Sequence, residues 1–218
     1  GDALRQDHHA SRLIRCAGLF RTRIPRFPRF ECVIVSAQTP SNAIARNGTE
    51  VIVKKLMLVS AFNPVSRLLP RVEPELKAKT VAFIPTASKG SLYSPIMGLA
   101  KHALRRMDVS IYSLDIASAS YGLIHDVIEA SDIIYVGGGN SFLLLQEMRR
   151  SGADTIITEA VTNGKPYIGE SAGAVVAGPD IGYIRDMDDA KAAPLLHDSR
   201  GLGLVDFRVC LLYTSDAA

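Results

Sequence analysis

Short apolar runs alternate with amphipathic stretches from Lys54 to Gly178, and this alternation is the feature that most constrains the fold. The apolar runs have the length of buried strands, and the stretches between them have the spacing of a helix face. The predicted strands are 54–62, 80–88, 109–116, 132–139, 166–171 and 202–209, and the predicted helices are 94–107, 121–130, 140–152, 153–164 and 172–178. Because parallel strands need crossover connections, this order predicts βαβ units.

The predicted architecture is an α/β fold, a three-layer αβα sandwich around a mainly parallel sheet. A chain of 218 residues with 47% hydrophobic residues can bury one sizeable core, which argues against disorder of the whole chain. No apolar run approaches the ~20 residues that a membrane helix needs, and the net charge of +3 gives no electrostatic basis for binding nucleic acid. We therefore expect no membrane association and no nucleic-acid partner.

The three cysteines, Cys16, Cys32 and Cys210, are scattered along the chain and form no C-x-x-C pair. An odd and dispersed set does not suit a disulfide framework or a structural zinc site. We therefore expect a reduced, cytoplasmic protein that carries no metal.

The first fifty residues differ in composition from the rest of the chain. They hold eight Arg, no Lys and four acidic residues, whereas the remaining residues hold 17 basic and 18 acidic ones. Pro25 and Pro28 interrupt this stretch, which has no sustained strand or helix period. We interpret residues 1–52 as a disordered or non-native leader, with an organellar transit peptide as the alternative. Residues 53–209 are the predicted α/β domain, and residues 210–218 are interpreted as a non-native tail.

The segment Gly169-Glu170-Ser171-Ala172-Gly173 has the form G-x-S-x-G and lies where a predicted strand turns into a predicted helix. In such a turn the serine has a strained backbone and its Oγ projects out of the sheet, which suits a nucleophile. The amide of Ala172, at the start of the helix, is a candidate donor to a developing oxyanion. The alternative is a glycine-rich turn that only packs the helix close to the sheet.

A second glycine cluster, Val136-Gly137-Gly138-Gly139-Asn140, also joins a predicted strand to a predicted helix. Glycines in such a loop let backbone amides approach a ligand, either a phosphate or an oxyanion on a neighbouring strand. The cluster has neither the G-x-G-x-x-G pattern nor the P-loop pattern. A tight turn without a ligand is the alternative.

An acyl-transfer reaction at a serine also needs a base. The chain has five histidines: His8, His9, His102, His125 and His197. The first two lie in the leader and the next two lie within predicted helices, so only His197, in a loop after the G-x-S-x-G turn, is a candidate base. Three nearby aspartates are interpreted as a solvated loop: Asp186, Asp188 and Asp189. Glu170, beside the serine, points either into the site or away from it.

The segments VGGGNSFLLLQEMRRSGAD, YIGESAGAVVAGPDI and MDD…APLL…GLGLVDF resemble the dipeptidase E (alpha-aspartyl dipeptidase) family of serine peptidases, which has the class I glutamine amidotransferase-like fold, similar to flavodoxin. The resemblance covers about residues 54–208. It implies that Ser171 is the nucleophile and that Gly138 or Gly139, with the Ala172 amide, forms the oxyanion hole. The implied activity is hydrolysis of small peptides, in the best-known members dipeptides with an N-terminal aspartate, through an acyl-enzyme.

The resemblance implies no metal and no organic cofactor, and a small peptide as the partner. It does not identify the substrate-binding residues or the oligomeric state, although Arg185 is a candidate partner for an acidic side chain.

The chain departs from the family pattern where the family has its catalytic histidine. The family has a Pro-His-aromatic step after the strand that ends in GLVDF. Counted along this sequence, the histidine of that step corresponds to Leu212 and the aromatic residue to Tyr213. We therefore expect a fragment, native from about Val53 to Val209, with a sheet that is incomplete at the C-terminus and with little activity. The alternatives are a catalytically dead amidotransferase-like binding protein and a flavodoxin-like nucleotide binder that uses the GGGN loop.

Overall fold

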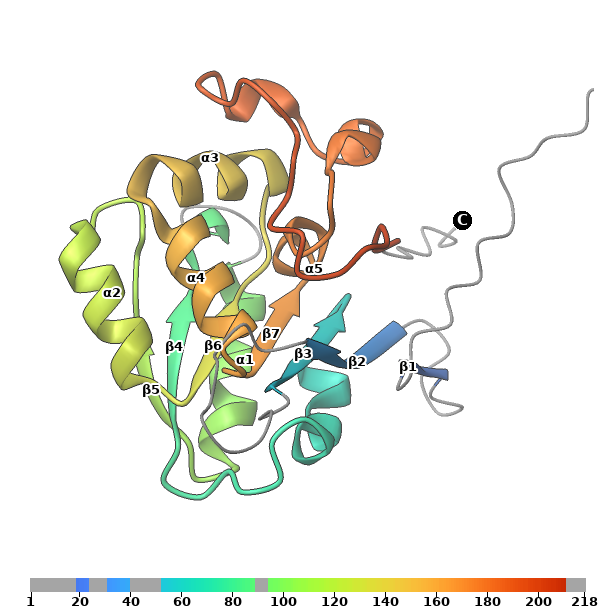
Figure 1. The fold of residues 1–218 in the computed structure, drawn as a ribbon, viewed down its shortest axis with the longest axis vertical. Coiled ribbons are helices and arrows are strands. Elements are labelled where there is room, and N and C mark those ends of the chain that lie inside the picture. The colour runs from blue at the N-terminus through green and yellow to red at the C-terminus, as the bar shows by residue number, and fades with distance from the viewer. Residues whose placement is uncertain (1–18, 24–30, 40–51, 89–93, 211–218) are drawn as a thin grey trace, which may run out of the picture.

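A seven-stranded sheet forms the centre of the computed structural model, which describes residues 19–23, 31–39, 52–88 and 94–210 (Figure 1). The strand order is β1-β2-β3-β7-β6-β4-β5. The strands are β1 (Leu19–Arg23), β2 (Glu31–Thr39), β3 (Ile52–Val59), β4 (Thr80–Ile84), β5 (Ser110–Ser113), β6 (Ile133–Val136) and β7 (Tyr167–Glu170). The five strands from β3 to β5 in this order pair in parallel, which confirms the predicted mainly parallel sheet.

Helices cover both faces of the sheet, as predicted for an αβα sandwich (Figure 1). The helices are α1 (Ser94–Arg105), α2 (Tyr121–Ala130), α3 (Ser141–Ser151), α4 (Ala153–Thr162) and α5 (Ala172–Val176), with 3-10 helices η1 (Asn63–Arg71), η2 (Thr86–Ser88), η3 (Gly182–Asp186) and η4 (Ala190–Ala192). Side chains alternate between the faces of a strand. In β3, Leu56 and Leu58 join the core formed with α2 to α5, whereas Met57 and Val59 join the core formed with η1 and α1.

Strands β1 and β2 extend the sheet in a part of the chain where the sequence predicted no strand. Both are antiparallel, and β2 pairs with β3 from Cys32 opposite Val59 to Thr39 opposite Ile52. The backbone groups at the edge of a sheet offer a template for pairing that does not depend on an apolar period in the added strand. β2 does contain the β-branched run Val33-Ile34-Val35, a strand signal that the prediction of a disordered leader overlooked. The other residues of the predicted leader, with His8 and His9, and the predicted tail beyond residue 210 lie outside the described residues.

The predicted sixth strand of the α/β domain, residues 202–209, is wrong. This segment is irregular, and its amides donate to the carbonyl oxygens at the end of α5: Leu202 to Val176 at 2.8 Å and Leu204 to Ala177 at 2.9 Å. The last carbonyls of a helix lack partners within the helix, so this segment caps α5. Leu204, Val205 and Val209 are nevertheless buried core residues, and Leu202 and Phe207 pack against the same core while partly buried.

An ion pair at the start of β6 leads to a prediction about stability in acid. Asp132 Oδ2 accepts a hydrogen bond from the Thr80 amide at 2.8 Å, and Oδ1 accepts one from Lys79 Nζ at 2.9 Å. The Thr80 amide, with Lys79, lowers the pKa of Asp132. The carboxylate therefore stabilises the fold above its unfolded pKa of about 3.9, and this contribution is lost as the pH falls through the folded pKa.

We expect Asp132→Asn to lower the unfolding temperature at pH 7 and to have a smaller effect as the pH approaches 2. The reason is that the wild-type carboxylate loses the same charge by protonation. Thermal unfolding followed by circular dichroism between pH 7 and pH 2 measures both proteins. Asp206→Asn, at an exposed position, serves as the control. A constant difference between D132N and wild type across this range would contradict the prediction.

Candidate active site

The G-x-S-x-G segment forms the turn between β7 and α5, as predicted. Ser171 has φ 52° and ψ −111°, a backbone conformation that costs a residue with a side chain about 1–3 kcal/mol. The Ser171 amide donates to the Val59 carbonyl at 2.8 Å, and the Ser171 carbonyl accepts from the amides of Ala174 and Val175. The strained residue is thus held both by β3 and by the first turn of α5.

The two glycines of the motif are required by close backbone contacts. A Cβ atom on Gly169 would lie 2.6 Å from the carbonyl oxygen of Gly173, and a Cβ atom on Gly173 would lie 2.1 Å from the carbonyl oxygen of Val136. Both distances are far shorter than a van der Waals contact between carbon and oxygen. Only glycine lets α5 start so close to β6 and β7.

The GGG loop lies against the side chain of Ser171. A Cβ atom on Gly138 would lie 3.1 Å from Ser171 Cβ and 3.6 Å from Ser171 Oγ. The two glycine motifs meet because β6 and β7 are neighbours, with Val136 in register with Gly169. The sequence analysis considered that the GGG loop could serve a serine on a neighbouring strand. In the structure, the GGG loop and the Ser171 turn lie together at the carboxyl ends of β6 and β7.

The remaining candidate oxyanion donors lie close to the same turn. Gly139 has φ 134°, and a Cβ atom there would lie 2.1 Å from the carbonyl oxygen of Ala87 in η2, so the loop is tightly packed. Ala172 is 1% exposed and is the first residue of α5. The roles of Gly138, Gly139 and Ala172 as oxyanion donors stay a prediction.

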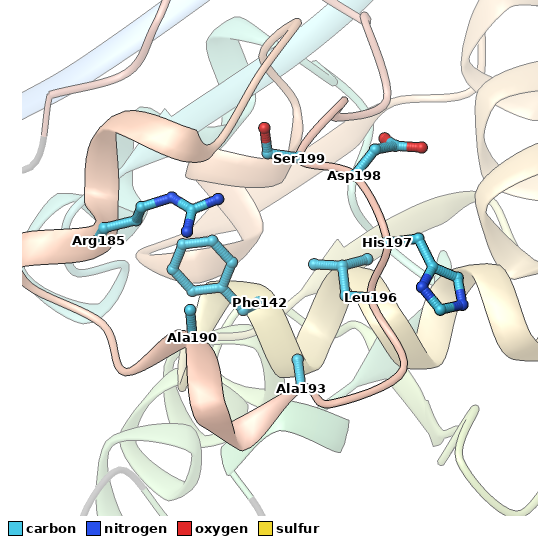
Figure 2. A pocket seen from close by; sticks show the side chains of 8 residues that line it. All are labelled: Phe142, Arg185, Ala190, Ala193, Leu196, His197, Asp198 and Ser199. Carbon is cyan, nitrogen blue, oxygen red and sulfur yellow. The ribbon is translucent and has the colours of Figure 1, made fainter.

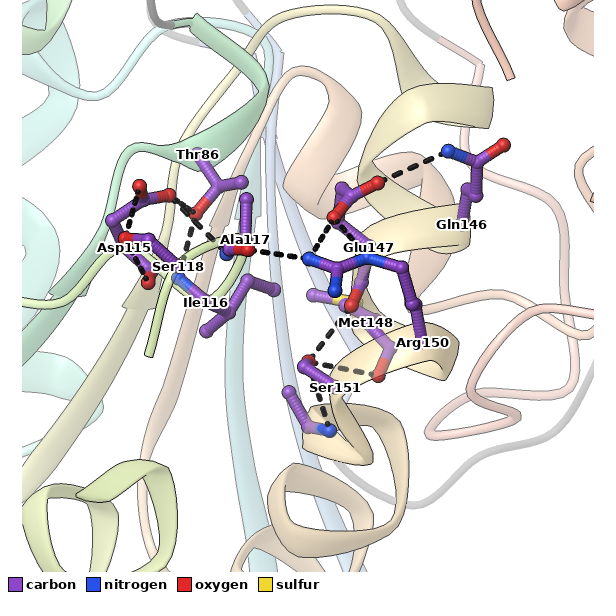
Figure 3. A network of polar contacts seen from close by, with 11 residues as sticks. Thr86, Asp115, Ile116, Ala117, Ser118, Gln146, Glu147, Met148, Arg150 and Ser151 are labelled. Carbon is purple, nitrogen blue, oxygen red and sulfur yellow. Dashed lines mark hydrogen bonds and ion pairs between the residues drawn. The ribbon is translucent and has the colours of Figure 1, made fainter. Parts of the chain in front are cut away.

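A polar network braces η2, which contacts Gly139, against α3 (Figure 3). Thr86 Oγ1 donates to Asp115 Oδ1 at 3.0 Å, and the Ile116 amide donates to Thr86 Oγ1 at 3.1 Å. On the other side, Arg150 contacts the Ala117 carbonyl and the carboxylate of Glu147. The network links the ends of β4 and β5 to α3 and so holds the surroundings of the GGG loop.

Glu170 points away from the face that carries α5, which resolves the two orientations that the sequence left open. Its carboxyl group accepts hydrogen bonds from the Phe62 amide at 2.8 Å and from the Tyr135 hydroxyl. Both partners belong to the core that includes η1 and α1. Glu170 is 1% exposed, and burial raises the pKa of its carboxyl group.

The predicted solvated loop of three aspartates is wrong for Asp188. Asp188 Oδ2 accepts a hydrogen bond from the Ser141 amide at 2.8 Å, and Asn140 Nδ2 donates to the Asp189 carbonyl at 2.9 Å. A carboxylate is attracted to the unpaired amides at a helix N-terminus. Asp186 and Asp189 are exposed, as predicted. The segment with η3 and η4 therefore packs on the first turn of α3, directly after the GGG loop.

The described histidines occupy three different places. His102 and His125 are exposed on α1 and α2, and His125 Nδ1 lies 3.3 Å from Asp126 Oδ1. His197 lines a small pocket of about 90 Å³ above the first turn of α3. Figure 2 shows the Arg185 guanidinium over the Phe142 ring, 5.7 Å from its centroid, and the His197 imidazole on the opposite side of this pocket. A role for His197 as a base or for Arg185 in substrate binding stays a prediction.

The described residues, 19–23, 31–39, 52–88 and 94–210, contain neither a metal-binding cluster nor a membrane-spanning helix. Among them, no group of three or more His, Cys, Asp or Glu side chains is arranged to hold a metal ion. No helix within these ranges is both long enough and apolar enough to cross a membrane.

The chain matches the family model of peptidase family S51 over residues 57–217. It is 46% identical over 154 residues to the uncharacterized peptidase Lmo0363 of Listeria monocytogenes, covering 71% of this chain and 75% of that protein. It is 41% identical over 162 residues to the uncharacterized peptidase PM1590 of Pasteurella multocida, covering 74% and 78%. Identity to peptidase E of Haemophilus influenzae is 39% over 114 residues, which cover 52% of this chain and 50% of that protein.

A solved structure agrees with the sequence comparisons. The crystal structure of a Listeria monocytogenes protein assigned as a peptidase E has a TM-score of 0.68 and 46% sequence identity. The similarity covers 70% of this chain and 76% of the crystallised chain. The match to the family model, over residues 57–217, includes both glycine motifs.

Proposed function

Since this chain belongs to peptidase family S51, we propose that it is a serine-type peptidase whose nucleophile is Ser171. The observation that carries the proposal is the strained Ser171 backbone at the turn between β7 and α5, with Gly138 beside Oγ. Strained residues of this kind persist where the surrounding structure holds them, and they cluster at active sites. The resemblance to dipeptidase E points to the same serine.

The proposed reaction proceeds through an acyl-enzyme. Ser171 Oγ attacks the carbonyl carbon of the substrate, and the negative charge that forms on the carbonyl oxygen faces the amides of Ala172 and of Gly138 or Gly139. The amine leaves after it has taken up a proton, and water then hydrolyses the ester on Ser171. We propose small peptides as substrates, in particular dipeptides with an N-terminal aspartate.

We also propose that this chain hydrolyses peptide bonds slowly. From the resemblance we expect the general base of the family at position 212, where this sequence has Leu212. Without the base, proton transfer from Ser171 and to the leaving amine loses its catalyst, and only the oxyanion hole and substrate binding accelerate the reaction. A fluorophosphonate has a good leaving group, so its reaction needs no proton on the departing group, and only the loss of the Ser171 hydroxyl proton stays uncatalysed.

The test is labelling with a fluorophosphonate probe, followed by digestion and mass spectrometry. We expect one adduct on Ser171, and faster cleavage of aspartyl-leucine than of leucyl-leucine in a parallel assay of dipeptides. An adduct at another serine would contradict Ser171 as the nucleophile. A folded chain that forms no adduct, even when a Leu212→His variant restores the expected histidine, would instead support the binding-protein alternative.

A further inference from the structure

Glu170 is a buried carboxyl group for which the proposed reaction has no direct use. It is 1% exposed and is the last residue of β7, directly before the nucleophile. Its two hydrogen-bond donors, the Phe62 amide and the Tyr135 hydroxyl, are both neutral groups. A carboxyl group buried among neutral partners is costly, because neutral donors replace its hydration only in part. Such a residue needs an explanation other than packing.

The contacts of Glu170 connect the nucleophile turn to both neighbouring strands. Tyr135 lies on β6, and Phe62 follows β3 by three residues. On the other face of the sheet, α5 and the GGG loop contact the turn. The turn is therefore held from both faces of the sheet, by α5 on one side and by the Glu170 carboxyl group on the other.

The backbone of Ser171 requires such support. Its φ of 52° is unfavourable for a residue with a side chain, so the conformation persists only where neighbouring contacts prevent relaxation. The backbone of Glu170 is held in the sheet, where it pairs with Val59, and the amide of Ser171 donates to the Val59 carbonyl. The side-chain bonds of Glu170 to the Phe62 amide and the Tyr135 hydroxyl add anchors on the face opposite α5.

We propose that Glu170 is a positioning residue that holds Ser171 in its strained conformation, with Oγ beside the GGG loop. This inference rests on the proposed function of Ser171. Glu170 acts through the backbone of its neighbour and does not touch the substrate. Its two carboxyl oxygens accept one hydrogen bond from each side of β7, from Phe62 and from Tyr135.

The geometry predicts an order of effects among substitutions. Glu170→Gln keeps one acceptor oxygen for the Phe62 amide but presents an NH₂ group to the Tyr135 hydroxyl. Glu170→Leu removes both bonds while keeping a side chain of similar size. Tyr135→Phe removes one bond, and its ring keeps the stacking on Phe83 and the edge contact with Phe62.

The experiment measures the rate of fluorophosphonate modification of Ser171 in the full chain as a function of probe concentration. We expect the limiting rate constant to fall about 100-fold in E170L and about tenfold in E170Q and Y135F, since a misplacement of about 1 Å can cost 100-fold. The probe concentration for half-maximal rate is expected to stay constant, because the binding surface is unchanged. Partial activity in E170Q relative to E170L is the expected rescue by the conservative variant.

Ser131→Ala is the matched control for a purely structural effect. Ser131 is 4% exposed, and its Oγ donates to the Val127 carbonyl at 2.7 Å, far along the chain from the turn. We expect S131A to lower the unfolding temperature without changing the limiting rate by more than about twofold. The control shows how the labelling rate responds when only stability is lowered. If the labelling rate of the Glu170 variants falls only in proportion to the fraction of folded protein, the positioning role is refuted.

Crystal structures of wild type and of E170Q and E170L provide a readout that does not depend on reactivity. We expect Ser171 to leave its positive φ in E170L and Oγ to move away from Gly138. A folded E170L or E170Q protein with φ near 52° and an unchanged rate would overturn the inference. A chain that resists the probe both as wild type and as a Leu212→His variant would refute the proposed function. In that case, the φ angle of Ser171 in the crystal structures of the variants still tests whether Glu170 holds the turn.

Discussion

Replacing Ser171 with alanine is expected to abolish fluorophosphonate labelling, whereas the slow peptidase activity of the chain should fall only modestly, because a unit that already lacks its base has little left to lose. The substitution removes only Oγ, the atom that would form the bond to the substrate. The turn itself should survive, because Ser171 holds its position through backbone bonds to Val59, Ala174 and Val175. Intact-protein mass spectrometry after exposure to the probe measures the effect, and circular dichroism verifies that S171A is folded.

Ser60→Ala is the sharpest control for this prediction. Ser60 follows β3 directly, at the position opposite the Ser171 turn, and its Oγ is buried and has no hydrogen-bond partner among the described residues. Removing a buried hydroxyl that has no partner should leave the unfolding temperature unchanged or raise it, because its desolvation cost disappears. We expect S60A to be labelled as wild type is. Labelling that persists in S171A and disappears in S60A would show that the wrong serine is assigned.

Gly173→Ala is expected to destabilise the fold by at least about 3 kcal/mol. The new methyl group would lie 2.1 Å from the carbonyl oxygen of Val136, and this contact is with backbone, so no side chain can rotate away. Either α5 or the end of β6 must move, and both positions contribute to the Ser171 site. For a chain of this size the loss corresponds to a drop of roughly 6–12 °C in the unfolding temperature.

The matched control makes the same chemical change where space is open. Gly98 lies within α1, and a Cβ atom there would meet no atom within 4 Å. Gly98→Ala should therefore stabilise the protein by about 0.5–1 kcal/mol, because alanine has the higher helix propensity. Thermal and urea unfolding of both variants measures the two effects. The packing explanation is wrong if G173A unfolds at the wild-type temperature or if G98A loses as much stability as G173A.

Both predictions depend on the place where β6 and β7 end side by side. The sequence indicated each glycine motif at a strand end, since strand, glycine and helix signals lie within a few residues of one another. It could not show that Gly138 touches Ser171, because their contact depends on the strand order. A mainly parallel sheet is compatible with β6 and β7 as neighbouring strands, and the pairing of Val136 with Gly169 shows that they are neighbours.

Residues 202–209 and Asp188 differ from their predicted structure for the same physical reason. Residues 202–209 have an apolar pattern because they are partly buried, yet their amides bind the carbonyls of α5 rather than another strand. Asp188 was predicted to be solvated because its partner, the Ser141 amide, is 47 residues away. The residue types indicated an apolar, buried segment at 202–209 and a polar residue at Asp188. They could not identify the hydrogen-bond partners, which are the carbonyls of α5 and the Ser141 amide.

By itself, the sequence determined the properties that depend on near neighbours along the chain: the apolar periods of the strands and helices, and the glycines that permit a turn at Ser171. Only the tertiary structure decided which groups meet across the sheet. Glu170 and Phe62 are 108 residues apart, and their hydrogen bond forms because β3 and β7 are adjacent. Local preferences act over a few residues, whereas such pairings follow from the packing of the whole sheet, which no short segment encodes.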